Sequence, residues 1–203
     1  MREEDDFIVI ETNPTATKVP SGKVLSLVEE TDPILKTKMP LFDFSDKSVS
    51  PKKISEDLIA TLKAHRALGI AAPQCNLPYR VFVVGAEDNY ITMFNPEIIS
   101  VSEKTAHMPE YCLSFPFLEL NITRPESITV RYQDINGNTL TESFSGITAR
   151  CCLHEFQHLE GITFNTLAKP LALKNGLKKR EKYIKQFARQ MVAQRRMANE
   201  IPR

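Results

Sequence analysis

The stretch CCLHEFQHLEG, residues 151–161, most constrains what this chain can fold into. On a helix, residues four apart share a face, so His154 and His158 point the same way and can hold one metal ion. A buried helix with such polar groups must satisfy them, and a metal ion does so. Burial is indicated because apolar residues flank the histidines on several sides: Ile147, Cys151, Phe156 and Leu159.

Glu155 completes an HExxH pattern. It lies about 100° round the helix from His154, so it can reach a water molecule without being a ligand. The pattern is typical of sites where a glutamate is the general base for a water activated by a metal. The structural alternative is a core helix that carries polar residues by chance.

A catalytic metal site usually has three protein ligands, and the third is not obvious. No histidine follows His158, and Glu160 is too close along the helix, which argues against zinc proteases with a downstream ligand. The upstream candidates are His65, Cys75, His107 and Cys112. A thiolate binds zinc or ferrous iron strongly, but spacing does not choose between the two cysteines.

The remaining pattern predicts an α+β fold, with antiparallel β-sheets packed around the central HExxH helix. Ser50 and Pro51 suit the start of an N-terminal helix, Asn136-Gly137 suits a hairpin turn, and Asn95-Pro96 is expected to stop a strand. The expected elements are a helix at 50–68, strands at 80–85 and 90–94, a hairpin at 127–144, the central helix at 145–161 and a basic C-terminal helix at about 177–198.

At 203 residues the chain is expected to be one domain with extensions. Turn formers and prolines predict a flexible N-terminal extension at 1–24, followed by a catalytic domain at 25–170 and a basic helix and tail at 171–203. No apolar run is long enough to span a membrane. The acidic residues 2–6 do not resemble a signal or import sequence, and four cysteines form no evident disulfide framework, so we expect a cytoplasmic protein.

Three motifs in order resemble those of the peptide deformylases: LGIAAPQ at 68–74, EYCLS at 110–114 and HEFQHLEG at 154–161. The similarity extends to TDPILKTKMP at 31–40 and TRPESITVRYQDINGN at 123–138, and covers roughly residues 24–185. The resemblance implies hydrolysis of the N-formyl group of N-formylmethionyl peptides, with release of formate.

The resemblance also implies roles for individual residues. Cys112, His154 and His158 would bind one divalent ion, Fe²⁺ in most members, with Zn²⁺ or Ni²⁺ able to replace it. Glu155 would pass a proton from water to the leaving amine. The Gln74 amide and the Leu113 N–H would stabilise the oxyanion, and Gly69 would let the peptide approach in strand-like fashion.

By the same analogy, the methionine side chain would lie near Leu68, Glu110, Ile147 and Cys151. Core packing is the alternative for these residues. Arg124 would either pair with Glu110 or be a surface charge on the hairpin.

Four positions depart from the family pattern: Ala67, Tyr111, Leu153 and Gln157. Tyr111 stands beside Cys112 where a glycine is usual, so it would narrow the cleft or turn into the core. A catalytically weak relative that binds metal, peptides or ribosomes is therefore the alternative function. A general HExxH endopeptidase is disfavoured by the other two motifs.

The C-terminal helix is strongly basic, with nine Lys or Arg and one Glu between residues 174 and 196. Such a run is either a solvated helix face or a surface for a polyanion. The resemblance implies the second, as docking on ribosomal RNA.

Overall fold

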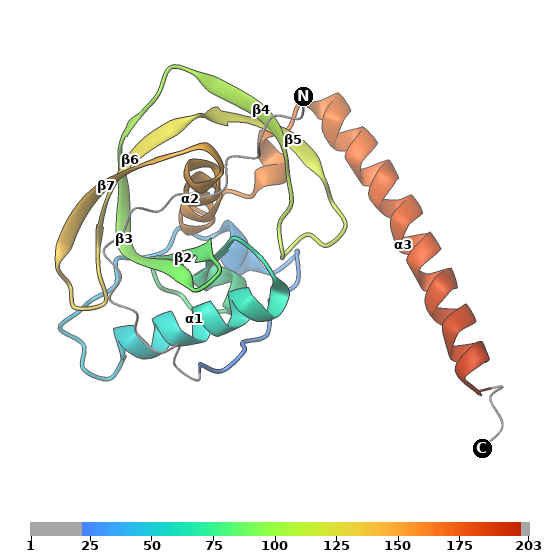
Figure 1. Cartoon of the computed structure of the whole chain (residues 1–203), viewed down its shortest axis with the longest axis horizontal. Helices are drawn as coiled ribbons and strands as arrows, with labels where there is room; N and C mark the ends of the chain where they lie inside the picture. Colours follow the sequence, from blue (N-terminus) through green and yellow to red (C-terminus); the bar gives the residue numbers. More distant parts are fainter. Residues whose placement is uncertain (1–21, 200–203) are drawn as a thin grey trace.

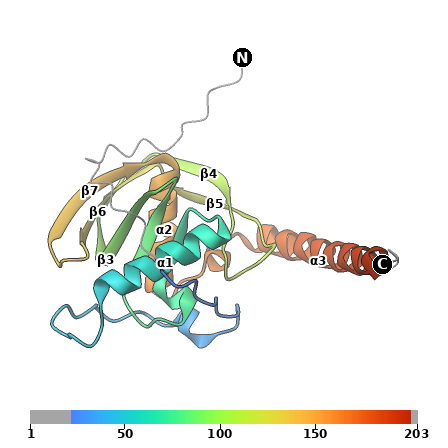
Figure 2. The ribbon, with the colours of Figure 1, turned by 60° about the horizontal axis from the view of Figure 1, so that its bottom comes forward.

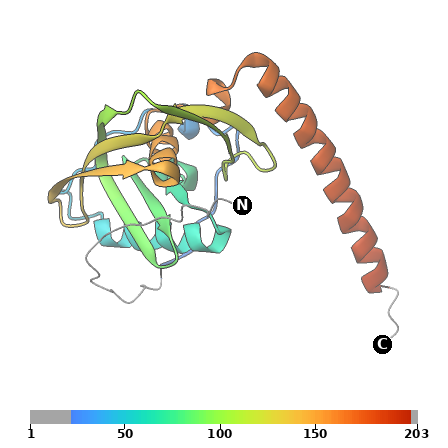
Figure 3. The same cartoon turned by 45° about the horizontal axis from the view of Figure 1, so that its top comes forward.

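The computed structural model describes residues 22–199 and confirms the expected α+β fold. Helix α2 (Gly146–Leu159) lies in the middle of the molecule, and strands of two antiparallel sheets curve around it (Figures 1 and 3). The larger sheet has the order β1-β2-β3-β6-β7, and β4 pairs with β5 in the smaller one. The strands are β1 (Gly69–Ala71), β2 (Val81–Ala86), β3 (Asn89–Val101), β4 (Thr105–Glu110), β5 (Leu120–Pro125), β6 (Ser127–Gln133) and β7 (Thr139–Ser145). The other helices are α1 (Pro51–His65), α3 (Pro170–Asn199) and the 3₁₀ turns η1 (Pro33–Lys36), η2 (Ala72–Cys75) and η3 (Phe164–Leu167).

Strand β2 is apolar on both faces because a helix covers each of them. Phe82 and Val84 belong to the buried cluster that includes Cys152 of α2. Val83 belongs to a second cluster with Leu58 of α1. Alternate side chains of a strand point to opposite faces, so a strand between two helices reads as a continuous apolar run. Figure 2 shows α1 across the face of the sheet opposite α2.

The predicted N-terminal helix and hairpin are both confirmed. Ser50 accepts a hydrogen bond from the Lys53 N–H at the start of α1, and Arg66 ends the helix in a left-handed conformation. In the β6–β7 hairpin, Ile128 pairs with Phe144. Gly137 has φ of 84°, a turn conformation that glycine adopts without cost.

The expectation that Asn95-Pro96 ends a strand is wrong, since β3 continues to Val101. The pairing with β6 shifts register between Phe94 and Glu97, which marks a bulge. A bulge leaves a residue outside the hydrogen-bond ladder, so a proline, which has no N–H to donate, is tolerated there. Asn95 adopts φ of 49° at this point, and its side chain bonds Phe42 and Gln133.

Helix α3 begins at Pro170, earlier than the sequence suggested. A proline suits the first turn of a helix, and Leu173 packs against the buried cluster that contains Leu118 and Ile122. The helix then leaves the body of the molecule (Figures 1 and 2). Its apolar residues Leu177, Ile184, Phe187 and Met191 are each at least 41% exposed.

Most of the expected N-terminal extension, residues 1–21, lies outside the described residues. Just after it, the Lys23 N–H donates to Asp57 Oδ1 (2.6 Å) and the Leu25 N–H to Thr61 Oγ1 (2.9 Å), so the chain is tied to α1 from Lys23 onward. Between residues 22 and 199, no helix has the length and apolar character needed to span a bilayer.

Candidate metal centre

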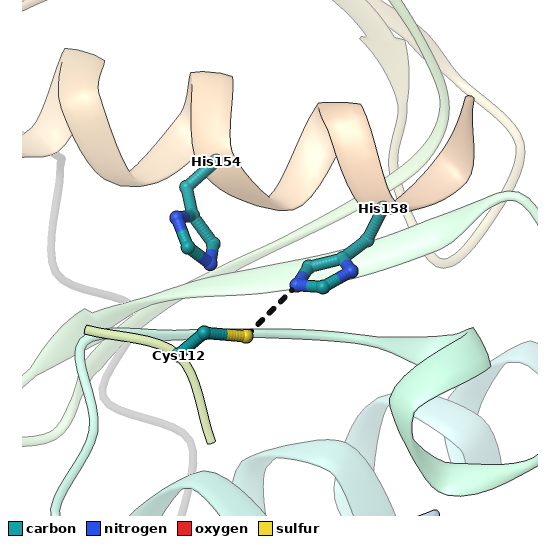
Figure 4. A group of neighbouring side chains, drawn as sticks. All are labelled: Cys112, His154 and His158. Carbon is teal, nitrogen blue, oxygen red and sulfur yellow. Dashed lines mark hydrogen bonds between the residues drawn. The ribbon is translucent and has the colours of Figure 1, made fainter. Parts of the chain in front are cut away.

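Cys112, His154 and His158 lie together in the interior, and each offers one ligand atom within 4.8 Å of the others. The two histidines come from one face of α2, and Cys112 follows β4 on the facing loop (Figure 4). Cys112 Sγ is 3.2 Å from His158 Nε2. All three side chains are buried. It is the one such group of three in the described part of the chain.

The structure separates Cys112 from the other third-ligand candidates. His107 is exposed and bonds Thr123, and His65 lies at the rim of the cavity described below. Cys75 is buried elsewhere, and its burial raises its pKa to about 12. Cys75 is not part of the group whose ligand atoms lie within 4.8 Å of one another.

The triad suits a divalent transition metal ion. One thiolate and two imidazoles match the ligand preferences of zinc and ferrous iron, and three protein ligands is the number typical of catalytic sites. The other ring nitrogen of His154, Nδ1, is 3.1 Å from Glu110 Oε2. A carboxylate in this position fixes the orientation of a ligating histidine and leaves its Nε2 for the metal.

Glu110 anchors a buried network of charges rather than standing alone. Its Oε1 accepts from Arg124 Nε and from Arg150 Nη1 (2.6 Å). Arg124 therefore pairs with Glu110 and is no hairpin surface charge. Burial opposes ionisation of Glu110, but the hydrogen bonds from Arg124 and His154 outweigh it and lower its pKa to about 2. Glu110 is thus held as a carboxylate beside His154.

Sequence reasoning missed Arg150, which is 4% exposed and also donates to the carbonyls of Ile122 and Ala106. The sequence spacing could have indicated its place, because residues 150, 154 and 158 recur every four positions and therefore share one face of α2. An arginine on the buried face of a metal-binding helix requires a buried acidic partner.

Glu155 is buried next to Gly69, with no hydrogen-bond partner for its Oε2 among the described residues. Burial raises its pKa to about 7, against the opposing effects of His154 and Arg124. A Cβ at position 69 would lie 2.6 Å from Glu155 Oε1. The missing side chain of Gly69 therefore makes room for this carboxylate.

Gln74 and Leu113 flank the triad with N–H groups. Gln74 Oε1 accepts from the Ala71 N–H (2.9 Å), which directs Nε2 toward Cys112 Sγ (3.5 Å) and Ser114 Oγ (3.2 Å). The Leu113 N–H donates to no protein group in residues 22–199. The Leu113 N–H can therefore bind an anionic oxygen directly, whereas Gln74 Nε2 would exchange one of its two acceptors for it.

A cavity of about 670 Å³ opens onto the triad. The predicted site residues that line it are Leu68, Gly69, Gln74, Glu110, Cys112, Leu113, Ile147, Cys151, His154 and Glu155. Only His158 of the predicted set does not line the cavity, and it is buried at the triad. Residues from three separate segments of the chain, 68–74, 110–113 and 147–158, thus meet at one site.

The four departures from the family pattern leave this cavity open. Ala67 has no positive φ, because Arg66 makes the left-handed turn before it. Tyr111 is 64% exposed and turns away from the core, with its hydroxyl donating to Glu119. Gln157 accepts from Arg124 Nη1 (2.9 Å), and Leu153 packs against the cluster around α2.

This fold and site define a metal-dependent hydrolase of the HExxH type. Residues 24–173 match the sequence model of the family described as Polypeptide deformylase. The chain belongs to the peptide deformylase family, whose members remove the N-formyl group from peptides.

Individual relatives agree. A peptide deformylase of Dictyoglomus thermophilum is 40% identical over 131 residues, which cover 64% of this chain and 84% of the relative. One from Erythrobacter litoralis is 32% identical over 190 residues, 78% of this chain and 98% of the relative. The deformylase of Synechococcus elongatus in complex with actinonin superposes with a TM-score of 0.73 at 27% identity, covering 83% of this chain and 92% of that one.

Proposed function

We propose that this protein hydrolyses the formyl group of N-formylmethionyl peptides and releases formate. The observation that carries the proposal is the buried Cys112, His154 and His158 triad at a cavity that also holds Glu155, whose Oε2 has no hydrogen-bond partner within residues 22–199. These elements supply a metal position, a base and space for a peptide.

The triad would hold the ion, which supplies Lewis-acid chemistry by polarising a carbonyl and lowering the pKa of a water molecule. Glu155 takes a proton from the attacking water at its free Oε2 and gives it to the leaving nitrogen as the C–N bond breaks. Its pKa of about 7 suits both steps, since a group that accepts and then donates a proton works best near the ambient pH. Water and formamide thereby become formate and a free amine.

The charge that develops on the formyl oxygen needs donors fixed in advance. Gln74 Nε2 is held beside the triad by the bond from Ala71 to its Oε1, and the Leu113 N–H has no competing protein acceptor in residues 22–199. Such donors need no rearrangement during the reaction, which is why they favour the transition state.

The peptide would bind along β1, which among the described strands pairs with β2 alone and so lies at the edge of the larger sheet. Leu68 and Gly69 at this edge line the cavity, and the unpaired edge of a strand can offer backbone N–H and C=O groups to an extended peptide. The methionine side chain would lie toward Ile147 and Cys151 on α2, which line the cavity together with the buried Glu110 and with Leu68, which is 39% exposed.

A catalytically weak relative is disfavoured because Tyr111, the residue expected to block the cleft, points outward. The test is amine release from formyl-Met-Ala-Ser by protein loaded anaerobically with iron or nickel. Glu155→Gln, with its metal content measured, is the control. Turnover that collapses in the variant while metal is retained supports the proposal, and no turnover by fully loaded wild type would overturn it.

Several finer assignments belong to the same proposal. Fe²⁺ is the metal we expect, with Zn²⁺ or Ni²⁺ as substitutes, and metal analysis of anaerobically purified protein tests this. We assign catalysis to residues 25–170 and place the protein in the cytoplasm. A relative from Solanum lycopersicum is named for the chloroplast, so fractionation of the source cells is the measurement that decides.

Docking on ribosomal RNA through α3 is a further part of the proposal. Lys178 and Lys182 are exposed and have no acidic partner in the described residues, and the helix extends away from the body (Figure 2). Pelleting with ribosomes at low and high salt, for wild type and for Lys178→Glu/Lys182→Glu, tests it. Binding that ignores both salt and the substitutions would count against it.

A further inference from the structure

Tyr111 is an unusual residue for the mouth of the cavity. A large ring stands 64% exposed directly beside the ligand Cys112, and it lines the cavity together with Phe117, which is 48% exposed. Exposed aromatic rings at a cavity rim mark surfaces that bind apolar groups.

Helix α3 holds this rim in place by three separate contacts. Tyr111 donates its hydroxyl to Glu119, and Lys179 of α3 donates to the same carboxylate (2.9 Å). Arg180 donates to the Pro116 carbonyl (2.9 Å). The ring of Phe117 lies 5.6 Å from that of Phe187 on α3.

Figure 1 shows the loop between β4 and β5 on the side of the molecule that faces α3. Arg180 also donates to Glu30 (2.6 Å), which ties the helix to the N-terminal part of the chain. Although α3 projects from the body of the molecule, Lys179, Arg180 and Phe187 thus tie it to the loop that carries the aromatic rim.

The direction of the peptide decides which of its residues meets the rim. A peptide paired antiparallel with β1 would start at the triad, near Gln74, and run back toward Leu68 and Arg66. Its methionine side chain would then point toward Ile147 and Cys151 of α2, which line the cavity. Because side chains of a strand alternate between faces, the next side chain points to the open side, where Tyr111 lies.

We propose that Tyr111 and Phe117, positioned by α3, form a binding surface for an apolar side chain at the second residue of the formylated peptide. The inference rests on the proposed deformylase function and adds a preference to it. The contact is made equally in the bound and the reacting peptide, so the preference acts through KM and leaves kcat unchanged.

The test compares formyl-Met-Phe-Ser with formyl-Met-Gly-Ser. We expect wild type to have a KM about three- to tenfold lower for the first peptide, the size of one aromatic contact. Tyr111→Phe keeps the ring and should retain most of this ratio between the two KM values. Tyr111→Gly brings it close to one. Equal KM values in wild type, or an unchanged ratio in Tyr111→Gly, would overturn the inference.

The support from α3 is tested with a matched pair of lysines. Lys179→Ala breaks the bond to Glu119 and should reduce the ratio. Lys185→Ala removes only the pair with Glu181 on the same helix and should leave it as in wild type. If Lys179→Ala has no effect on the ratio, α3 does not position the rim.

Peptide binding separates this inference from the proposed function. Calorimetry with the unformylated peptides Met-Phe-Ser and Met-Gly-Ser needs no turnover, and a deformylase of Acinetobacter baumannii has been solved with Met-Ala-Ser bound. Failure of the metal-loaded wild type to hydrolyse any formyl peptide would refute the proposed function. Tighter binding of Met-Phe-Ser that is lost in Tyr111→Gly would still support the rim, and equal binding would refute it.

Discussion

The carboxylate of Glu155 occupies the space that a side chain at residue 69 would need. A Cβ on Gly69 would lie 2.6 Å from Glu155 Oε1 and 2.8 Å from its Cγ. Gly69 lies in edge strand β1 and Glu155 on α2, so this close approach joins the strand proposed to bind the peptide to the proposed base.

Gly69→Ala is therefore expected to displace Glu155 and lower kcat by about 10²-fold, because a shift of about 1 Å in a catalytic group has a cost of that order. Gly146→Ala is the control, since a Cβ there meets nothing within 4 Å. Its φ of 57° should cost about 1–2 kcal/mol of stability without lowering kcat. Near-normal kcat in metal-loaded Gly69→Ala would contradict the prediction.

Glu110→Gln should destabilise the protein by about 3–5 kcal/mol, because it leaves the buried guanidinium groups of Arg124 and Arg150 without their carboxylate. It should also weaken metal binding by about 10- to 100-fold through His154. Denaturant unfolding and metal titration measure the two effects.

Glu97→Gln is the matched control for Glu110→Gln. Glu97 pairs with Arg131 at 2.6 Å, but both side chains are more than half exposed. Loss of this exposed ion pair should lower the free energy of unfolding by less than about 1 kcal/mol. Similar costs for the two substitutions would show that the buried network does not stabilise the fold.

The sequence predicted the elements whose signals are local. Ser50 caps α1, Gly137 makes the hairpin turn, and the four-residue spacing of His154 and His158 places them on one face of α2. The order of three short motifs indicated the family. Each of these signals lies within a few residues.

What the sequence did not predict depends on contacts between distant segments. Strand β1 has three residues and β4 lacks a clear alternation of apolar residues, and β3 passes through Pro96 only because it bulges there. Arg150 was missed because its partner Glu110 is 40 residues away. The outward turn of Tyr111 depends on Glu119 and on α3.

Metal removal should lower the melting temperature, because a ligand that binds only the folded state stabilises it. A free metal concentration 100 times the dissociation constant contributes about 2.7 kcal/mol, which for a domain of this size is about 5–10 °C. Thermal unfolding with and without a chelator measures it. The shift should persist in His107→Ala and vanish in His158→Ala, and its persistence in the latter would exclude His158 as a ligand.

The hairpin turn should give the stability a pH dependence at acidic pH. Burial opposes ionisation of Asp134, but hydrogen bonds from the side chains and N–H groups of Asn138 and Asn136 outweigh it and lower its pKa below 3.8. A carboxyl whose pKa is lower in the folded state stabilises the protein fully above its unfolded pKa. That contribution is lost as the pH falls through the folded value. Wild type should therefore be more stable than Asp134→Asn at pH 7 and lose this advantage below about pH 4. The measurement is the unfolding free energy of both proteins at pH 7 and at pH 2, compared at each pH. A difference that stays constant over this range would show that Asp134 does not contribute through its charge.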